Sequence, residues 1–157
     1  MILVSSCLCG INCRYNGGNN ETEWVKKLYK DGKAVLICPE CLGEMETPRH
    51  PHEIIGGNGT QVLSGKAKVM DKNKEIDSTE KFIKGANLSL ELAKKHNIKL
   101  AILKSKSPSC GYGKIYDGTF SGKIIDGNGV ACQLFIDNGI KIITEEDYDK
   151  WRDLNEL

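Results

Sequence analysis

Three short apolar runs in this chain each end close to a cysteine, and this pattern constrains the fold more than any other feature. The runs are Ile2 to Val4, Ala34 to Ile37 and Leu100 to Leu103, and the cysteines are Cys7, Cys38 and Cys110. Continuous apolar runs of this length indicate strands that are covered on both faces. Parallel strands would bring the three thiols to one carboxyl edge, where open α/β sheets bind their ligands. The sequence therefore predicts a group of thiols at one edge of a sheet.

Helix signals alternate with these runs. We expect helices from Asn20 to Gly32, after Asp77, from Val130 to Gly139 and from Thr144 onward, with a further strand over Ile140 to Ile143. This alternation predicts an α/β fold of three layers, with a mostly parallel, Rossmann-like sheet flanked by helices. The 157 residues suffice for one domain with a proper core, and we expect a single domain over residues 1–157.

Two stretches break the alternation and are expected to form a small hairpin and loop insertion. Residues Thr47 to Asp77 hold two of the four prolines and are interpreted as a long functional loop leading to a hairpin through Val62 to Asp71. Residues Ser105 to Gly129 are rich in glycine, and Tyr116 to Gly122 are expected to form a tight turn or small hairpin.

Charge and cysteine content narrow the function classes. The formal net charge is +1 and the lysines are dispersed, so we do not expect nucleic acid as the partner. No apolar run is long enough for a membrane span. Seven cysteines is an odd number in a chain that can build a sufficient core, so metal-binding or catalytic thiols in a reducing cytoplasm are expected rather than a disulfide framework.

Thiolate ligands select zinc, copper(I) or iron-sulfur clusters, and the residues alone leave more than one site open. A structural zinc site can be drawn from Cys7, Cys9, Cys13 and the pair Cys38 and Cys41. The same pair, in Cys-Pro-Glu-Cys, can be a thiol redox site if Cys38 begins a helix and has a lowered pKa. Gly43 and the later Thr-Pro do not indicate such a helix, and a zinc knuckle leaves the distant cysteine near the third run unused.

Several longer motifs carry a resemblance to a known family. They are Ser5-Ser6-Cys7-Leu8-Cys9-Gly10, Cys13-Arg14-Tyr15-Asn16-Gly17, Cys38-Pro39-Glu40, Thr47-Pro48-Arg49, Phe82 with Gly85-Ala86, Lys106-Ser107-Pro108-Ser109-Cys110-Gly111 and Ile115-Tyr116-Asp117-Gly118-Thr119-Phe120. In these motifs the chain resembles the small thiouracil desulfidase family of bacteria and archaea, long catalogued as a domain of unknown function. The resemblance covers nearly the whole chain in the order of the family.

The resemblance implies a [4Fe-4S] cluster held by Cys7, Cys38 and Cys110. It further implies that the iron without a protein ligand takes sulfur from a small thiolated compound such as thiouracil, without net redox chemistry. The enzyme would be a desulfidase of the hydrolase or lyase type. Glu40 corresponds to a proposed proton carrier, whose pKa we expect to rise near a cluster. Ser107 corresponds to a catalytic or substrate-orienting residue.

Each of these roles has an ordinary structural alternative. Glu40 can be a helix-start carboxylate stabilised by the helix dipole, and Ser107 can satisfy turn amides. Arg49 can hold a substrate carbonyl or phosphate, or it can pair with Glu53 or Glu40. Cys13 matches a family position and is kept as a reserve ligand.

Three further cysteines and two lysines are also considered as candidate residues of the site. Cys9 stands where the family commonly has leucine, and Cys41 adds a second thiol next to the Cys-Pro-Glu motif. A thiolate from either residue can close the cluster and remove the open iron. Cys132 lies on the apolar side of a predicted helix and is expected in the core. Lys104 and Lys106 either neutralise the negative charge of the cluster or are solvated.

Overall fold

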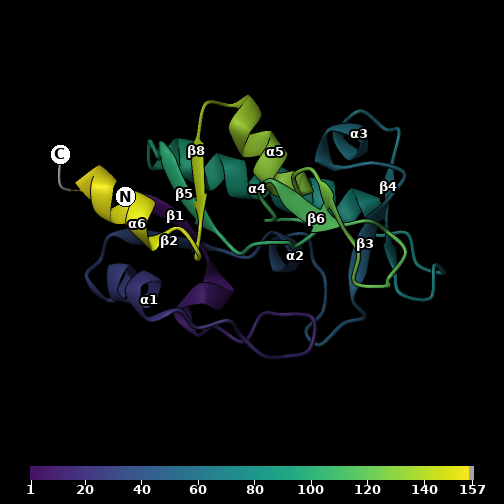
Figure 1. Ribbon diagram of the computed structural model, residues 1–157, viewed down its shortest axis with the longest axis horizontal. Coiled ribbons are helices and arrows are strands. Elements are labelled where there is room, and N and C mark those ends of the chain that lie inside the picture. The colour runs from purple at the N-terminus through teal and green to yellow at the C-terminus, as the bar shows by residue number, and fades with distance from the viewer. Residues whose placement is uncertain (156–157) are drawn as a thin grey trace.

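A parallel four-stranded sheet between helices is the main sheet of the computed structural model, which describes residues 1–155 (Figure 1). Its strands, in spatial order, are β2 (Ala34–Ile37), β1 (Ile2–Ser5), β5 (Leu100–Leu103) and β8 (Lys141–Thr144). In the register, Leu3 lies between Val35 of β2 and Ala101 of β5. The chain starts in the middle of the sheet, moves outward to β2, and then crosses back to β5. This reversal creates a topological switch point beside β1.

Successive side chains of each strand enter different cores, because side chains alternate between the two faces of a sheet. Leu3 and Ala101 belong to one buried cluster, whereas their neighbours Val4 and Ile102 belong to the other. All four side chains are fully buried. The continuous apolar runs in the sequence thus correspond to strands with both faces covered.

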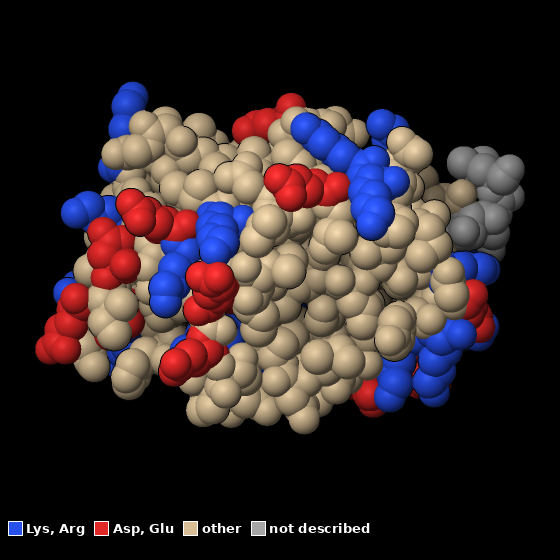
Figure 2. Space-filling view, turned by 180° about the vertical axis from the view of Figure 1, so that it is seen from behind, with Lys and Arg blue, Asp and Glu red and all other residues tan. Residues whose placement is uncertain are grey.

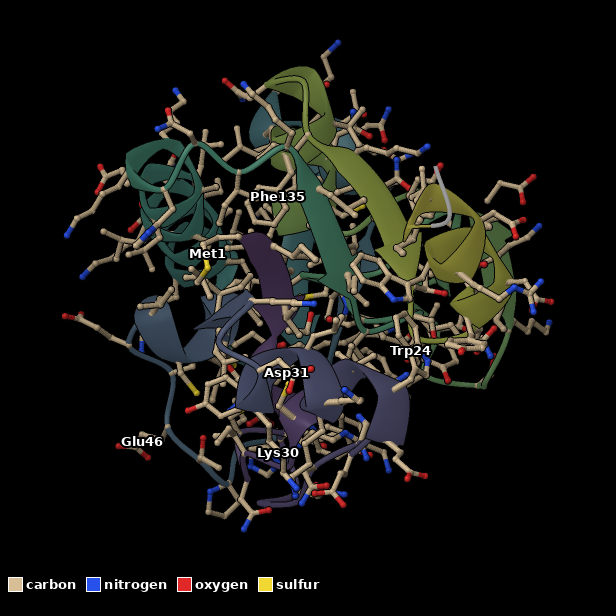
Figure 3. The ribbon with its side chains drawn as sticks, turned by 90° about the vertical axis from the view of Figure 1, so that its left-hand side faces the viewer. Met1, Trp24, Lys30, Asp31, Glu46 and Phe135 are labelled. Atoms are coloured by element: carbon tan, nitrogen blue, oxygen red, sulfur yellow. The ribbon has the colours of Figure 1, made fainter. Side chains whose placement is uncertain are left out.

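Helices cover both faces of this sheet. One face is covered by α4 (Thr79–Lys95) and α5 (Val130–Asp137), and the other by α1 (Glu23–Lys30) and α6 (Tyr148–Asn155). Figure 3 shows Phe135 of α5 on one side and Trp24 of α1 on the other, where Trp24 stacks with Trp151 of α6 at 6.2 Å between ring centroids. The predicted three-layer α/β fold is confirmed.

Two antiparallel ribbons lie outside the main sheet. The first pairs β3 (His52–Ile55) with β4 (Lys68–Asp71), which are joined by α3 (Gly59–Leu63), and the second pairs β6 (Lys114–Tyr116) with β7 (Ile124–Asp126). The second ribbon agrees with the expected small hairpin. The ribbon of β3 and β4 differs from the long loop and hairpin expected for this segment. Val62, expected in the hairpin, lies in α3 instead. A capping box was missed: Asn58 accepts from the N–H of Thr60 at 2.9 Å, and Gln61 accepts from the N–H of Asn58 at 2.9 Å.

Two short helical turns follow directly after strands. The 3₁₀ helix η1 (Ser6–Cys9) follows β1, and α2 (Pro39–Leu42) follows β2. The turn after β2 contradicts the expectation that no helix starts at Cys38. The start expected for α1 was also wrong, because the helix begins at Glu23 rather than at Asn20. The N–H of Asn20 instead donates to the carbonyl of Cys7 at 2.9 Å.

The surface carries mixed charge. On the face in Figure 2, basic and acidic side chains are interspersed around an uncharged central area. Among the described residues, no helix has the length and apolar character that crossing a membrane requires.

Candidate active site

The three cysteines named from the apolar runs lie at the same edge of the sheet. Cys7 follows β1, Cys38 follows β2 and Cys110 follows β5, and these strands are neighbours. All three side chains line one cavity of about 530 Å³. The structure thus brings together residues that are far apart in the sequence, at the switch point where open α/β sheets bind ligands.

Local structure presents each thiol to the cavity. Cys7 lies in η1, and Cys38 is the N-cap residue of α2 with an extended backbone that precedes Pro39. A proline at the first helical position suits this start, since that position needs no N–H donor. Cys110 lies in a turn after β5 that is tied together by Ser107, whose Oγ accepts from the N–H of Cys110 at 3.0 Å.

Cys13 is a fourth thiol in the cavity, and it lies between Cys7 and Cys38. The neighbouring Cys13 thiol lowers the pKa of Cys7, and it lowers the pKa of Cys38 to about 6. Because this thiol has one proton, it donates to one of the two sulfurs at a time, and interaction with both raises the pKa of Cys13 itself. Burial raises the pKa of Cys110. Cys7 and Cys38 therefore have lowered pKa values in this group of thiols, whereas Cys13 and Cys110 have raised ones.

The other three cysteines lie outside the lining of the cavity. The Cys9 thiol is buried against α1, with its Sγ 3.9 Å from the carbonyl of Val25, and burial raises its pKa to about 11. Cys41 is exposed, and its Sγ lies 3.6 Å from Thr47 Oγ1. Cys132 is fully buried in α5, as expected. Neither Cys9 nor Cys41 lines the cavity, although Cys41 Sγ lies 4.0 Å from the carbonyl of Cys13.

Glu40 projects into the same cavity from the first turn of α2. Arg49 donates from Nε to Glu40 Oε1 at 3.1 Å, and the exposed fractions of the two side chains are only 7% and 16%. Arg49 also donates from Nη2 to the carbonyl of Cys13 at 2.9 Å. Of the two partners weighed for Arg49, the structure selects Glu40, and the arginine ties this carboxylate to the loop that carries Cys13.

A pair of serine hydroxyls completes the contacts of Glu40. Ser109 donates from Oγ to Glu40 Oε2 at 3.1 Å, and Ser107 Oγ lies 2.9 Å from Ser109 Oγ. A hydroxyl has one proton, and an ionised carboxylate is the stronger acceptor, so the Ser107 hydroxyl donates to Ser109. Ser107 Oγ also accepts from the N–H groups of Ser109 and Cys110. The turn-amide role weighed for Ser107 is thus present together with a hydrogen-bonded chain that leads to Glu40.

Basic and aromatic side chains form the rest of the lining. Lys104 and Lys106 both face the cavity, and Lys104 Nζ lies 3.9 Å from a carboxylate oxygen of Glu145. Tyr116 and Phe120 contribute aromatic side chains. A cavity with soft thiols, cations and aromatic rings suits a flat polar ligand that carries sulfur.

The donor set fits a cluster better than a single ion. Across residues 1–155, no group of three or more His, Cys, Asp or Glu side chains is arranged to hold one metal ion. The zinc site drawn from the sequence is therefore not assembled in the described part of the chain, and Cys9 lies outside the cavity. Thiolates are the usual ligands of iron-sulfur clusters, whose core of several atoms needs a cavity between its ligands. Cys7, Cys38 and Cys110 around an open volume meet that requirement.

Comparisons with known proteins agree with this arrangement. The family model described as 2-thiouracil desulfurase matches residues 2–147. The chain belongs to the 2-thiouracil desulfurase family. A relative from Bacillus subtilis (strain 168), named uncharacterized protein YbbK, is 52% identical over 147 residues, covering 94% of this chain and 97% of the relative.

This family member is also similar to a solved protein structure. The solved protein is the [4Fe-4S]-dependent thiouracil desulfidase TudS, which is 34% identical to this chain. The match has a TM-score of 0.85 and covers 99% of this chain and 98% of that chain. The suspected family and the α/β fold are therefore confirmed.

Reasoning from the sequence missed two polar residues of the site in this family member. Asn20 was interpreted as a helix cap, yet its Nδ2 lies 3.9 Å from Cys7 Sγ and lines the cavity. Ser109 was named only as part of the motif that contains Cys110, yet its Oγ donates to Glu40 Oε2. No signal in the sequence indicated either role, because only the fold brings Asn20 to Cys7 and Ser109 to Glu40.

Proposed function

We propose that this chain is a [4Fe-4S]-dependent desulfidase that removes sulfur from a thiolated nucleobase or a similar thioamide compound. The observation that carries the proposal is the convergence of three strand-end thiols and one carboxylate on a single cavity. The family model and the solved relative support it. The net reaction replaces a C=S group with C=O, consumes one water and releases hydrogen sulfide, so no electrons are exchanged.

Cys7, Cys38 and Cys110 would hold the cluster. When bound by three thiolates, a cluster supplies an iron that has no protein ligand and acts as a Lewis acid for soft sulfur. The lowered pKa values of Cys7 and Cys38 favour the thiolate form that a ligand needs. Cys13 remains beside them as a thiol donor.

Glu40 would manage the proton balance of the reaction. Its Oε2 takes the proton of the water that replaces sulfur, and the same atom returns the proton to the departing sulfur. Ser109 and Ser107 extend a hydrogen-bonded chain from this atom. Arg49 holds the other oxygen, Oε1, so that the carboxylate cannot rotate away from the cavity.

The substrate side of the proposal is a small compound, because a cavity of about 530 Å³ lies in the range of small-molecule sites. The flat ring of a thiolated base suits the aromatic lining. A reducing compartment such as the cytoplasm is proposed as the location, and the seven free cysteines support it.

The decisive test is iron and acid-labile sulfide analysis of protein purified without oxygen, followed by addition of thiouracil. We expect a brown protein with about four irons per chain that releases sulfide. Cys7→Ala, Cys38→Ala and Cys110→Ala should each lose the cluster. Cys132→Ala is the matched control, since this thiol is buried in α5 and should keep the iron.

Two outcomes would contradict the proposal. Full iron content in all three variants would refute the ligand assignment. A colourless wild-type protein in which Cys38 and Cys41 cycle between thiols and a disulfide would favour a redox function, to which the start of α2 at Cys38 and its pKa of about 6 are also suited.

A further inference from the structure

Phe120 has a backbone conformation that a bulky side chain rarely adopts. Its φ angle is +56°, in the left-handed region, and its side chain lines the cavity of the candidate active site. Aromatic residues avoid this region because Cβ approaches the neighbouring carbonyl oxygen. Such conformations persist where the surrounding structure enforces them, and they are concentrated at functional sites. The contacts of the turn around Phe120 therefore hold it in this conformation.

The backbone of this turn packs closely against strand β3 at Gly118. Gly118 has a φ of +92°, and a Cβ added there would lie 2.6 Å from the carbonyl oxygen of Ile54. Asp117 stabilises the turn from within, since its Oδ1 accepts from the N–H of Thr119 at 2.9 Å. No side chain other than hydrogen fits at this close approach, so the position of the turn is fixed relative to β3.

A buried carboxylate then fixes Phe120. Glu53 of β3 is only 9% exposed, and its Oε1 accepts from the N–H of Gly118 at 2.9 Å and from the N–H of Phe120 at 3.2 Å. Hydrogen bonds to an ionised acceptor are about twice as strong as neutral ones. Glu53 was weighed above as a partner of Arg49, but the arginine pairs with Glu40. In the described structure Glu53 thus acts on the turn and not on the proton-handling group.

We propose that Phe120 is the residue that selects a flat ring, and that Glu53 is the positioning residue that holds its aromatic side chain at the cavity wall. This inference rests on the proposed function. Aromatic side chains stack on any nucleobase through its π-face, without hydrogen-bond readout. A wall of this kind contributes to affinity for the ring, whereas the thiols and Glu40 act on the C=S group.

The experiment compares variants of the cluster-loaded enzyme in two measurements, the steady-state kinetics with thiouracil and the Kd for uracil by calorimetry. Phe120→Leu should raise both the KM and the Kd about tenfold and leave kcat and iron content unchanged, because stacking is lost but the chemistry is not. Phe120→Tyr keeps the ring face and should retain wild-type values. Phe135→Leu is the matched control, because Phe135 is fully buried in α5 outside the cavity lining.

The positioning role has its own pair of variants. Glu53→Ala removes the acceptor of both N–H groups and should raise the KM as Phe120→Leu does. Glu53→Gln keeps an acceptor oxygen of the same reach and should restore most of the affinity.

The results separate the two proposals. Iron-loaded wild-type protein that releases no sulfide would refute the proposed function, and the uracil Kd would still test the ring wall. An unchanged Kd in Phe120→Leu, or an equal rise in Phe135→Leu, would overturn the inference.

Discussion

Glu40 has a different partner on each of its carboxylate oxygens. Arg49 occupies Oε1 and Ser109 occupies Oε2, so the group is held in one orientation before any substrate arrives. Such preorganisation lowers the cost of positioning a proton acceptor during reaction. The arginine also donates to the Cys13 carbonyl, which links Glu40 to the loop that carries a cavity thiol.

At this scale we predict the effect of Glu40→Gln. An amide of the same shape cannot take up a proton, so sulfide release from thiouracil should fall by about 10²-fold or more, as for loss of a general base. Iron and sulfide content should match wild type. Glu44→Gln is the control, because Glu44 follows α2 and pairs with the exposed Lys84. Wild-type turnover in Glu40→Gln would remove this residue from the mechanism.

Helix α2 presents both Cys38 and Glu40, and its position depends on a close crossing with α4. A Cβ on Gly85 of α4 would lie 1.7 Å from the carbonyl oxygen of Pro39 in α2, and a Cβ on Gly43 would lie 2.1 Å from the carbonyl oxygen of Lys81. The two helices meet backbone to backbone at these glycines. The crossing therefore sets how far two site residues extend into the cavity.

At the scale of elements we predict the effect of Gly85→Ala. The methyl group must displace α2, and overpacking of this kind costs about 1–3 kcal/mol of unfolding free energy. Denaturant unfolding should show this loss, and the iron content should fall because Cys38 moves. Asn87→Ala, at an exposed position of the same helix, should change neither quantity. A Gly85→Ala protein with wild-type stability and iron content would show that the crossing is unimportant.

In the whole molecule, the proposed ligands come from segments that only the folded sheet brings together. Cys7, Cys38 and Cys110 follow three different strands, so the unfolded chain has no preformed site. A group that binds only the folded state adds its binding free energy to folding. The cluster should therefore connect β1, β2 and β5 energetically.

At this scale we predict the effect of removing iron with a chelator under anaerobic conditions. The midpoint of thermal unfolding should fall by about 5 °C or more, as expected for a bound group in a domain of this size. A Cys7→Ser protein, already without the cluster, should show no further fall on chelation. Complete iron removal without any change in the midpoint would contradict this prediction.

Much of the architecture could be predicted from the sequence, because it depends on local patterns. The apolar runs and the helix periodicity were enough for the parallel α/β sheet, and the thiols at the strand ends followed from strand polarity. The ribbon of β3 and β4 could not be predicted. Its strands are short, its helix depends on a capping box, and pairing across α3 is a non-local choice.

What the sequence alone determined was the set of donors: three cysteines at strand ends, Glu40 beside one of them, and membership in a family. Only the tertiary structure decided how these donors are used. It assigned Arg49 to Glu40, brought Cys13 and Asn20 to the thiols, left Cys9 and Cys41 outside the cavity, and held Phe120 at its wall. The physical reason is that residue type determines which protons, hydrogen bonds and metal ligands a side chain can supply. Its hydrogen-bond partners and its burial depend on segments that meet only when the chain has folded.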